Sequence, residues 1–284
     1  VKYFLSEYSK KPGRVLDPFA GAGTTLFAGQ EIGWESYGIE LLPVGSFVMK
    51  TREAINHIDK EKLRNIVKNL WTEVQKIDNY ENHIKHISIT KDAFPDDTEE
   101  YLNKYLTYCS SINDENIQTV LRFAAFTILE EISFTRKDGQ YLRWDSRCKR
   151  DLNGKPFDKG KILSFEEAVK AKLNQIIQDL SPSQTISLFD KIETNGNSVK
   201  KKPVNVIEGT CLEELPKFKD NFFDFTVTSP PYCNRYDYTR TYALELVFLG
   251  YDNDQVRNLR QTMLSCTVEN KEKVEHLREF YSSI

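Results

Sequence analysis

The chain has 284 residues, of which 39% are apolar and 12% aromatic, so it can bury one sizeable core and a smaller subdomain. No stretch approaches the roughly 18 apolar residues that cross a bilayer, and the five cysteines lack the spacings typical of zinc sites or disulfide frameworks. The net charge of −3 hides a cluster of basic residues between positions 136 and 161. We therefore expect a globular protein of the cytoplasm with no metal centre.

The first block, residues 1–90, alternates helices and strands. A helical segment, VKYFLSEYSKK, is broken by Pro12 and Gly13, and RVLDPF then reads as a short buried strand that runs into a glycine turn. A helix over Thr25–Ile32, a strand SYGIEL and a helix from Pro43 toward Ile58 follow. This order favours an α/β fold with a doubly wound parallel sheet, whose ligand site lies at the carboxyl ends of the strands.

The second block, residues 91–202, interrupts this alternation. Helices are expected near Glu115–Ile132 and Phe165–Leu180, with a basic, aromatic loop between them, so we interpret the block as an inserted, mainly helical subdomain. The third block, residues 203–284, resumes the sheet with the strands VNVIEG and FDFTVTS. Its last part is polar, and DNDQVRNLRQ and ENKEKVEHLREFYSS read as helices.

A glycine turn after the first strand, DPFAGAGTT, is the first candidate site. Gly21 and Gly23 let backbone approach a ligand closely, and Glu40 at the end of the next strand can accept both hydroxyls of a ribose. The turn is not GxGxxG, and the carboxylate of Asp17 suits an ammonium group but would repel a pyrophosphate. S-adenosylmethionine therefore fits this site better than NAD.

The second candidate site is the segment TSPPY, which follows the apolar strand. Two prolines fix the backbone so that the Ser229 hydroxyl and the Pro230 carbonyl can accept hydrogen bonds from one amino group. Tyr232 offers an aromatic face on which a base rotated out of a duplex can stack. The structural alternative is a proline-bounded turn with a core tyrosine.

These residues resemble a known family. DPFAGAGTT looks like the cofactor-binding motif I, and TSPPY like the catalytic motif IV, of the DNA amino-methyltransferases that make N4-methylcytosine or N6-methyladenine. The stretch VIEGTCLEELPKFKDNFFDFTVTSPPY is similar to motif III of that family running into motif IV. The resemblance covers about residues 1–58 and 203–250. It implies a Rossmann-like methyltransferase sheet that uses S-adenosylmethionine, and double-stranded DNA with a flipped target base as the substrate.

The resemblance also implies residue roles. The cofactor would be bound by Asp17, Phe19, Gly21, Gly23, Thr24, Thr25, Glu40, Leu41, Gly209, Thr210 and Cys211, and methyl transfer carried by Ser229, Pro230, Pro231 and Tyr232. The family often has an aspartate where Thr210 stands. In this chain motif I precedes motif IV, but the residues of both motifs are more similar to those of the class in which motif IV precedes motif I, which suggests a permuted member. Family members with SPPY are mostly cytosine enzymes, which favours cytosine N4 over adenine N6.

The basic segment 133–150, SFTRKDGQYLRWDSRCKR, is the candidate DNA interface, because basic residues interleave there with aromatic ones. We expect DNA contacts from Arg136, Lys137, Arg143, Trp144, Arg147 and Arg150. The alternative packs Trp144 on the core and leaves the arginines solvated. Two rival functions remain: an RNA amino-methyltransferase that uses the same two sites, and a DNA-recognition subunit without catalysis.

Only four strands are expected, whereas a full fold of the resembled family has seven. The edge beyond the fourth strand would then be unpaired, which a soluble protein rarely tolerates. The chain also begins with Val1 instead of methionine, which suggests a fragment. We therefore expect the missing strands to come from a second polypeptide, a downstream segment of the same gene or a partner copy.

Overall fold

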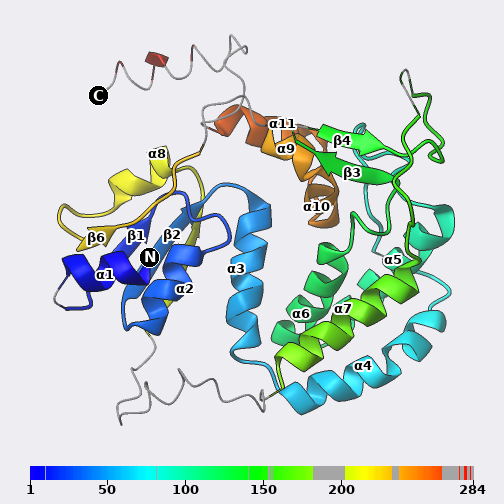
Figure 1. Ribbon diagram of the computed structural model, residues 1–284, viewed down its shortest axis with the longest axis horizontal. Coiled ribbons are helices and arrows are strands. Elements are labelled where there is room, and N and C mark those ends of the chain that lie inside the picture. The colour runs from blue at the N-terminus through cyan, green and yellow to red at the C-terminus, as the bar shows by residue number, and fades with distance from the viewer. Residues whose placement is uncertain are drawn as a thin grey trace. The chain divides into compact units, whose positions relative to one another are not determined.

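The computed structural model describes residues 1–263 except Lys10, Glu81, Gln140, Asn153, Lys155, 182–201 and 232–236; beyond residue 263 it describes only Glu275, Arg278, Glu279 and Ser282. The chain forms two compact units, Val1–Met49 with Pro182–Tyr232 and Lys50–Ser181 with Cys233–Ile284 (Figure 1). The boundaries of these two units differ from those of the three blocks expected from the sequence, 1–90, 91–202 and 203–284. The functional roles of the three blocks stay predictions. No helix in the described part is long and apolar enough to cross a membrane.

The first unit is built on a parallel sheet with strand order β5-β2-β1-β6, which confirms the expected α/β class. Its elements are α1 (Lys2–Tyr8), β1 (Arg14–Asp17), α2 (Thr24–Glu31), β2 (Glu35–Glu40), β5 (Val204–Glu208), α8 (Cys211–Glu214), the 3-10 helix η1 (Leu215–Lys217) and β6 (Phe225–Thr226). Each of the four expected strands is present, although β6 is only two residues long. The segment CLEELPKF between β5 and β6 forms α8 and then η1.

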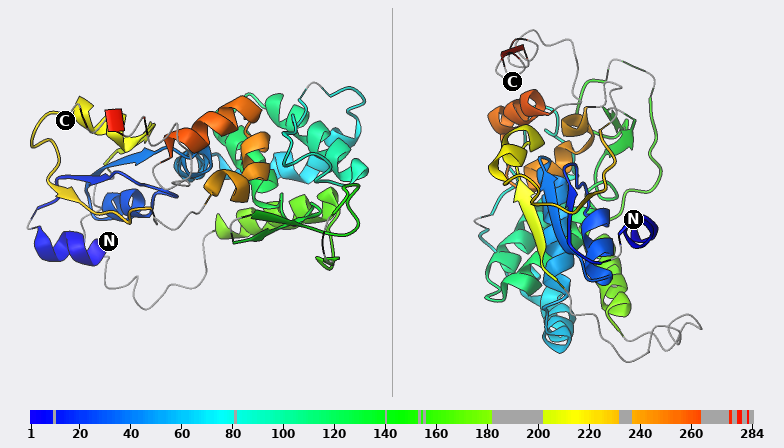
Figure 2. Two further views of the ribbon diagram at one scale, coloured as in Figure 1. Left: turned by 90° about the horizontal axis from the view of Figure 1, so that it is seen from above. Right: turned by 90° about the vertical axis from the view of Figure 1, so that its left-hand side faces the viewer.

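Both faces of this sheet are covered, as a parallel sheet requires. Neighbouring residues of a strand point to opposite faces. Accordingly, Val15 packs with Leu5 of α1 and with Trp34, while Leu16 packs with Ile39 and with Cys211 of α8. Figures 1 and 2 show α2 and α8 on opposite sides of the strands.

The second unit is a helical bundle with a β-hairpin. Its elements are α4 (Lys60–Gln75), α5 (Asp96–Ser110), α6 (Glu115–Thr127), β3 (Thr135–Asp138), β4 (Tyr141–Trp144), α7 (Phe165–Asp179), α9 (Tyr238–Thr241), α10 (Ala243–Phe248) and α11 (Asn253–Thr262). α3 (Pro43–Ile55) begins in the first unit and ends in the second. The side chains of Asp59, Asp114 and Ser164 cap α4, α6 and α7 by accepting backbone N–H bonds, which fixes where these helices begin.

Some elements differ from the sequence prediction. The helices expected at Glu115 and Phe165 are present, and α11 confirms the helix expected in DNDQVRNLRQ, but α4 and α5 are absent from the prediction. The basic segment expected as a loop is instead the antiparallel β3–β4 hairpin, which contacts α9. The helix expected in ENKEKVEHLREFYSS falls almost wholly outside the described residues.

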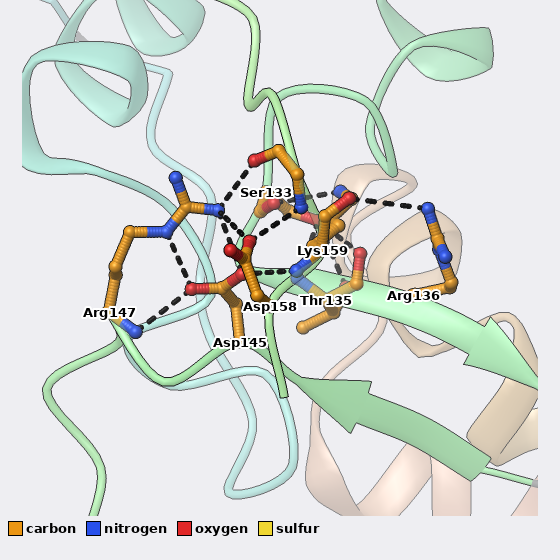
Figure 3. Close-up of polar contacts among 8 residues, drawn as sticks. Ser133, Thr135, Arg136, Asp145, Arg147, Asp158 and Lys159 are labelled. Carbon is orange, nitrogen blue, oxygen red and sulfur yellow. Dashed lines mark hydrogen bonds and ion pairs between the residues drawn. The ribbon is translucent and has the colours of Figure 1, made fainter. Parts of the chain in front are cut away.

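A buried carboxylate holds the base of this hairpin (Figure 3). Asp145 is fully buried, and its two oxygens accept bonds from Arg147 Nε at 2.7 Å and Arg147 Nη2 at 2.8 Å. The backbone N–H groups of Arg147 and Lys159 donate to the same carboxylate at 2.9 and 2.6 Å. The Arg147 bonds lower the pKa of Asp145 far below its usual range although burial opposes the shift. The carboxylate is therefore ionised at all ordinary pH values.

Lys159 closes the same cluster from the other side. Its ammonium donates to the carbonyl of Ser133 at 2.8 Å and to that of Glu130. Burial lowers the pKa of Lys159 to about 8. The buried polar groups of the cluster thus satisfy one another, and they tie the segment after the hairpin to the end of α6.

The structure predicts that Asp145→Ala lowers the free energy of unfolding by about 3 kcal/mol, because two partly buried backbone N–H groups and the Arg147 guanidinium lose their acceptor. Asp158→Asn is the matched control. Asp158 lies 3.5 Å from Arg147 with its side chain 82% exposed, so its loss should cost less than about 1 kcal/mol. Urea unfolding curves measure both, and equal midpoints for the two variants would contradict this role of Asp145.

Candidate functional site

The loops that leave the four parallel strands gather at one edge of the sheet. Because the strands are parallel, Asp17, Glu40, Gly209 and Thr228 all follow the carboxyl ends of their strands. Backbone bonds join the loops in turn: Ala20 N–H donates to Ile39 O at 3.0 Å, and Gly209 N–H donates to Glu40 O at 3.1 Å. The glycine turn and the segment after β5 therefore both pack against the end of β2.

The two candidate sites are joined by a hydrogen bond. The Thr228 hydroxyl donates to Asp17 Oδ1 at 2.8 Å across 211 positions of sequence. The same oxygen accepts the Phe19 N–H at 3.1 Å, and Asp17 is only 5% exposed. A second contact runs from the Thr25 hydroxyl to Val227 O at 3.3 Å. DPFAGAGTT and TSPP thus form one continuous site.

Glu40 is fixed by backbone amides from two directions. Gly21 N–H donates to its Oε2 at 2.6 Å, and Leu42 N–H donates to its Oε1 at 2.7 Å. Burial raises the pKa of Glu40 above the ordinary carboxyl value, and these hydrogen bonds oppose the rise. The carboxylate is therefore held in one orientation beside the glycine turn, and its pKa lies above that of a free glutamate.

The two glycines of the turn have different surroundings. Both have positive φ angles, +55° at Gly21 and +80° at Gly23, which side chains rarely adopt. A Cβ on Gly21 would meet nothing within 4 Å, so this glycine borders open space. A Cβ on Gly23 would come within 2.9 Å of Met49 and Phe27, which belong to the core. Gly23 thus serves the start of α2, and the open side of the turn is at Gly21.

The remaining predicted cofactor residues have varied surroundings. Thr24 is exposed at the start of α2, while Phe19 and Leu41 are partly buried. The Thr210 hydroxyl caps α8 by accepting the Leu212 N–H at 3.4 Å. Cys211 is buried among core residues, and burial raises the pKa of its thiol. These side chains of Thr210 and Cys211 are engaged in the fold.

The predicted catalytic loop follows β6. Thr228, Ser229 and Pro230 are exposed and Pro231 is partly buried, so the groups expected to accept an amino group are open to solvent. Tyr232 lies outside the described residues. In the described part of the chain, no group of three or more His, Cys, Asp or Glu residues is placed to hold a metal ion.

All six predicted DNA contacts have partners inside the second unit. Arg147 brackets Asp145, and Lys137 donates to Glu245 of α10 at 2.5 Å. The Arg150 guanidinium lies 4.3 Å from the centre of the Trp144 ring and donates to two backbone carbonyls. Arg136 and Arg143 lie over the ring of Phe157 and are exposed on the hairpin, and Arg147 is exposed as well.

Sequence reasoning missed two residues of these sites. Thr228 contacts Asp17, and its place at the end of a strand beside SPP was the available signal. Phe157 lies beneath the guanidinium groups of Arg136 and Arg143, at 5.7 and 4.1 Å from its ring centre. Nothing in its surrounding sequence marks that position, because the contact is made across the fold.

Comparison with known proteins finds several named type II methyltransferases. M.AvaI from Nostoc sp. is 45% identical over an alignment of 280 residues that covers 96% of this chain and 56% of that protein. M.BsoBI from Geobacillus stearothermophilus is 38% identical over an alignment of 290 residues, gaps included, that covers 100% of this chain and 56% of that protein. M.MjaII from Methanocaldococcus jannaschii is 21% identical over 245 residues, or 83% and 42%. The chain spans about 56% of the length of the first two. No family model and no solved structure matches it.

Proposed function

Because the chain belongs to the DNA methyltransferase family, we propose that it is the core of a site-specific DNA methyltransferase of a restriction-modification system. It would move a methyl group from S-adenosylmethionine to an exocyclic amino group of a base, in the cytoplasm where the cell's own DNA lies. The observation that carries the proposal is the hydrogen bond from Thr228 to Asp17, since it holds the SPP loop beside the glycine turn. A methyl donor in the turn would then be within reach of a base at the loop.

The charges of the site suit S-adenosylmethionine. A carboxylate offers about four acceptor positions, so Asp17 and Glu40 can accept further bonds beside those from backbone amides and Thr228. Glu40 would accept the ribose hydroxyls, and Asp17 would face the ammonium group of the methionine moiety. Open space beside Gly21 leaves room for the ligand. When bound, the cofactor supplies an electrophilic sulfonium methyl group.

Ser229 and Pro230 would prepare the base for methylation. The lone pair of an exocyclic amine is delocalised into its ring, which makes the amine a poor nucleophile. The Ser229 hydroxyl and the Pro230 carbonyl would accept its two N–H bonds and hold the nitrogen pyramidal, so that its lone pair points away from the ring. Such contacts require the base to leave the helix, and Tyr232 would stack on it. Serine at position 229 favours cytosine N4 over adenine N6.

We further propose a partner for the edge of the sheet. Among the described residues β6 pairs only with β1, and none of them pairs with its other edge beside the SPP loop. A further strand, from a second polypeptide, a downstream segment of the same gene or a partner copy, would pair there and cover the apolar faces next to the catalytic loop. The basic segment of the second unit, which carries Arg136 and Arg143, would face DNA.

The first prediction concerns Glu40. Glu40→Gln should weaken S-adenosylmethionine binding about 10- to 100-fold, because charged hydrogen bonds to the ribose are lost. In the wild type, affinity should fall as the pH is lowered toward the raised pKa of Glu40, and the fall should begin at a higher pH than protonation of an ordinary carboxyl group would require. The effect on folding has the opposite sign. A raised pKa contributes stability that is present below the ordinary carboxyl value and lost as pH rises through the raised value.

Calorimetric titration with S-adenosylmethionine at several pH values measures the affinity and its pH dependence. Glu35→Gln is the control, since Glu35 stands at the start of the same strand and contacts Tyr37. It should bind like the wild type. A Glu40→Gln variant with unchanged affinity and pH dependence would exclude Glu40 as the ribose acceptor.

The second prediction separates catalysis from binding. Ser229→Ala should lower methyl transfer to duplex DNA at least about 100-fold, because an acceptor that acts in the transition state is lost, and it should leave cofactor affinity unchanged. Ser111→Ala, an exposed serine of the second unit, serves as the control. Mass spectrometry of the hydrolysed nucleosides also identifies the base. Methylated tRNA with unmodified duplex DNA would favour the RNA enzyme. A chain that binds DNA but neither binds S-adenosylmethionine nor transfers a methyl group would favour a recognition subunit.

A further inference from the structure

The β3–β4 hairpin has two chemically different faces. The strands pair antiparallel with Arg136 opposite Arg143 and Lys137 opposite Leu142. Because side chains alternate along a strand, Arg136, Asp138, Tyr141 and Arg143 share one face, and the residues between them share the other. The first face is outward: Tyr141 is 53% exposed, and both arginines are exposed.

The outward arginines are held in place before any ligand arrives. Both guanidinium groups lie over the ring of Phe157, at 5.7 Å for Arg136 and 4.1 Å for Arg143. Arg136 Nη2 also donates to Lys159 O at 3.3 Å. Ordering an arginine during binding costs free energy, and these contacts reduce that cost. Asp138 pairs with Arg143 at 3.7 Å, but both side chains are 46% exposed, so the pair is weak and open to exchange.

The inward face fastens the hairpin to helices. Lys137 bonds to the buried Glu245 of α10 at 2.5 Å and lies 4.6 Å from the centre of the Tyr242 ring. The Thr241 hydroxyl donates to Gly139 O at 3.3 Å, and Leu142 is buried. With the Asp145 cluster at its base, the hairpin is a supported ribbon and not a free loop (Figures 1 and 3).

We propose that this ribbon enters the major groove of DNA and that Arg136 and Arg143 read guanine edges there; this rests on the proposed function. The major groove is about 12 Å wide and admits a two-stranded ribbon, whose strands lie about 4.8 Å apart. A guanidinium fork matches the O6 and N7 acceptors of guanine. Tyr141 stands beside the two arginines at the tip and contacts an adjacent base pair or phosphate. Lys137 and Arg147 position the ribbon and do not touch DNA.

Double-stranded DNA fits this face better than duplex RNA. The major groove of A-form RNA is deep and narrow, and side chains on a ribbon cannot reach its base edges. Simple attraction to phosphates would need only positive charge, whereas here two planar groups are oriented over one ring. The arrangement is therefore suited to sequence recognition.

The test separates the effect of the positive charge of each arginine from the effect of its planar guanidinium group. Sequencing plasmid DNA modified by the wild-type chain identifies its site, and two short duplexes are then made, one with that site and one with a single G·C pair replaced by A·T. Arg136→Lys and Arg143→Lys keep the charge and lose the fork. At least one should lose about 5- to 150-fold in affinity for the site duplex in fluorescence anisotropy, with binding to the altered duplex and to S-adenosylmethionine unchanged. Arg64→Ala on α4 should bind both duplexes like the wild type.

Each other outcome overturns a defined part. Variants that bind both duplexes like the wild type overturn the reading role alone, and an equal loss on both duplexes reduces it to a phosphate contact. Tighter binding of a matching RNA duplex also overturns it. A wild-type chain that, with the proposed further strand supplied, binds S-adenosylmethionine but neither binds nor modifies any DNA overturns the proposed function as well.

Discussion

The hydrogen bond from the Thr228 hydroxyl to Asp17 joins two segments that the sequence separates by the whole second block. It depends on β6 pairing beside β1, because only neighbouring parallel strands deliver their carboxyl-end loops to the same place. Asp17 thereby acquires two duties: it shapes the glycine turn through Phe19 and holds the loop that carries Ser229. Glu40 completes the arrangement from β2, with both oxygens fixed by backbone amides.

In the second unit, too, charged side chains hold loops and strands in place. Asp145 and Lys159 support the hairpin, and Arg147 is bound to Asp145. Fewer basic side chains near the hairpin are therefore available to a polyanion than the sequence of this segment suggests. Arg136 and Arg143 differ from their neighbours because the strand alternation turns them outward over Phe157. Two partly buried ion pairs, Arg147–Asp145 and Lys137–Glu245, support the strands that carry the two exposed arginines.

The parallel sheet and the contents of the glycine turn were predictable from the sequence, because they depend on local hydrophobic runs, glycines and strand-end carboxylates. The hairpin was not predictable, since its alternation is hidden by basic residues on both faces. One of them, Lys137, is partly buried and pairs with Glu245, which is more than 100 positions away. α4 showed an available signal in its Asp59 cap and in the spacing of Leu63, Leu70 and Val74. The cofactor contact of Gly23 stays a prediction, but the sequence did not indicate that a Cβ at this position would meet the core residues Met49 and Phe27.

A double-mutant cycle on Asp17 and Thr228 tests most directly whether the two motifs form one site. Calorimetric affinity for S-adenosylmethionine is measured for the wild type, Asp17→Asn, Thr228→Val and the double variant. If the bond orients the Asp17 carboxylate, the two losses are coupled by about 1 kcal/mol, and the double variant binds little worse than Asp17→Asn alone. Strictly additive losses, or a Thr228→Val variant that binds like the wild type, would contradict the account.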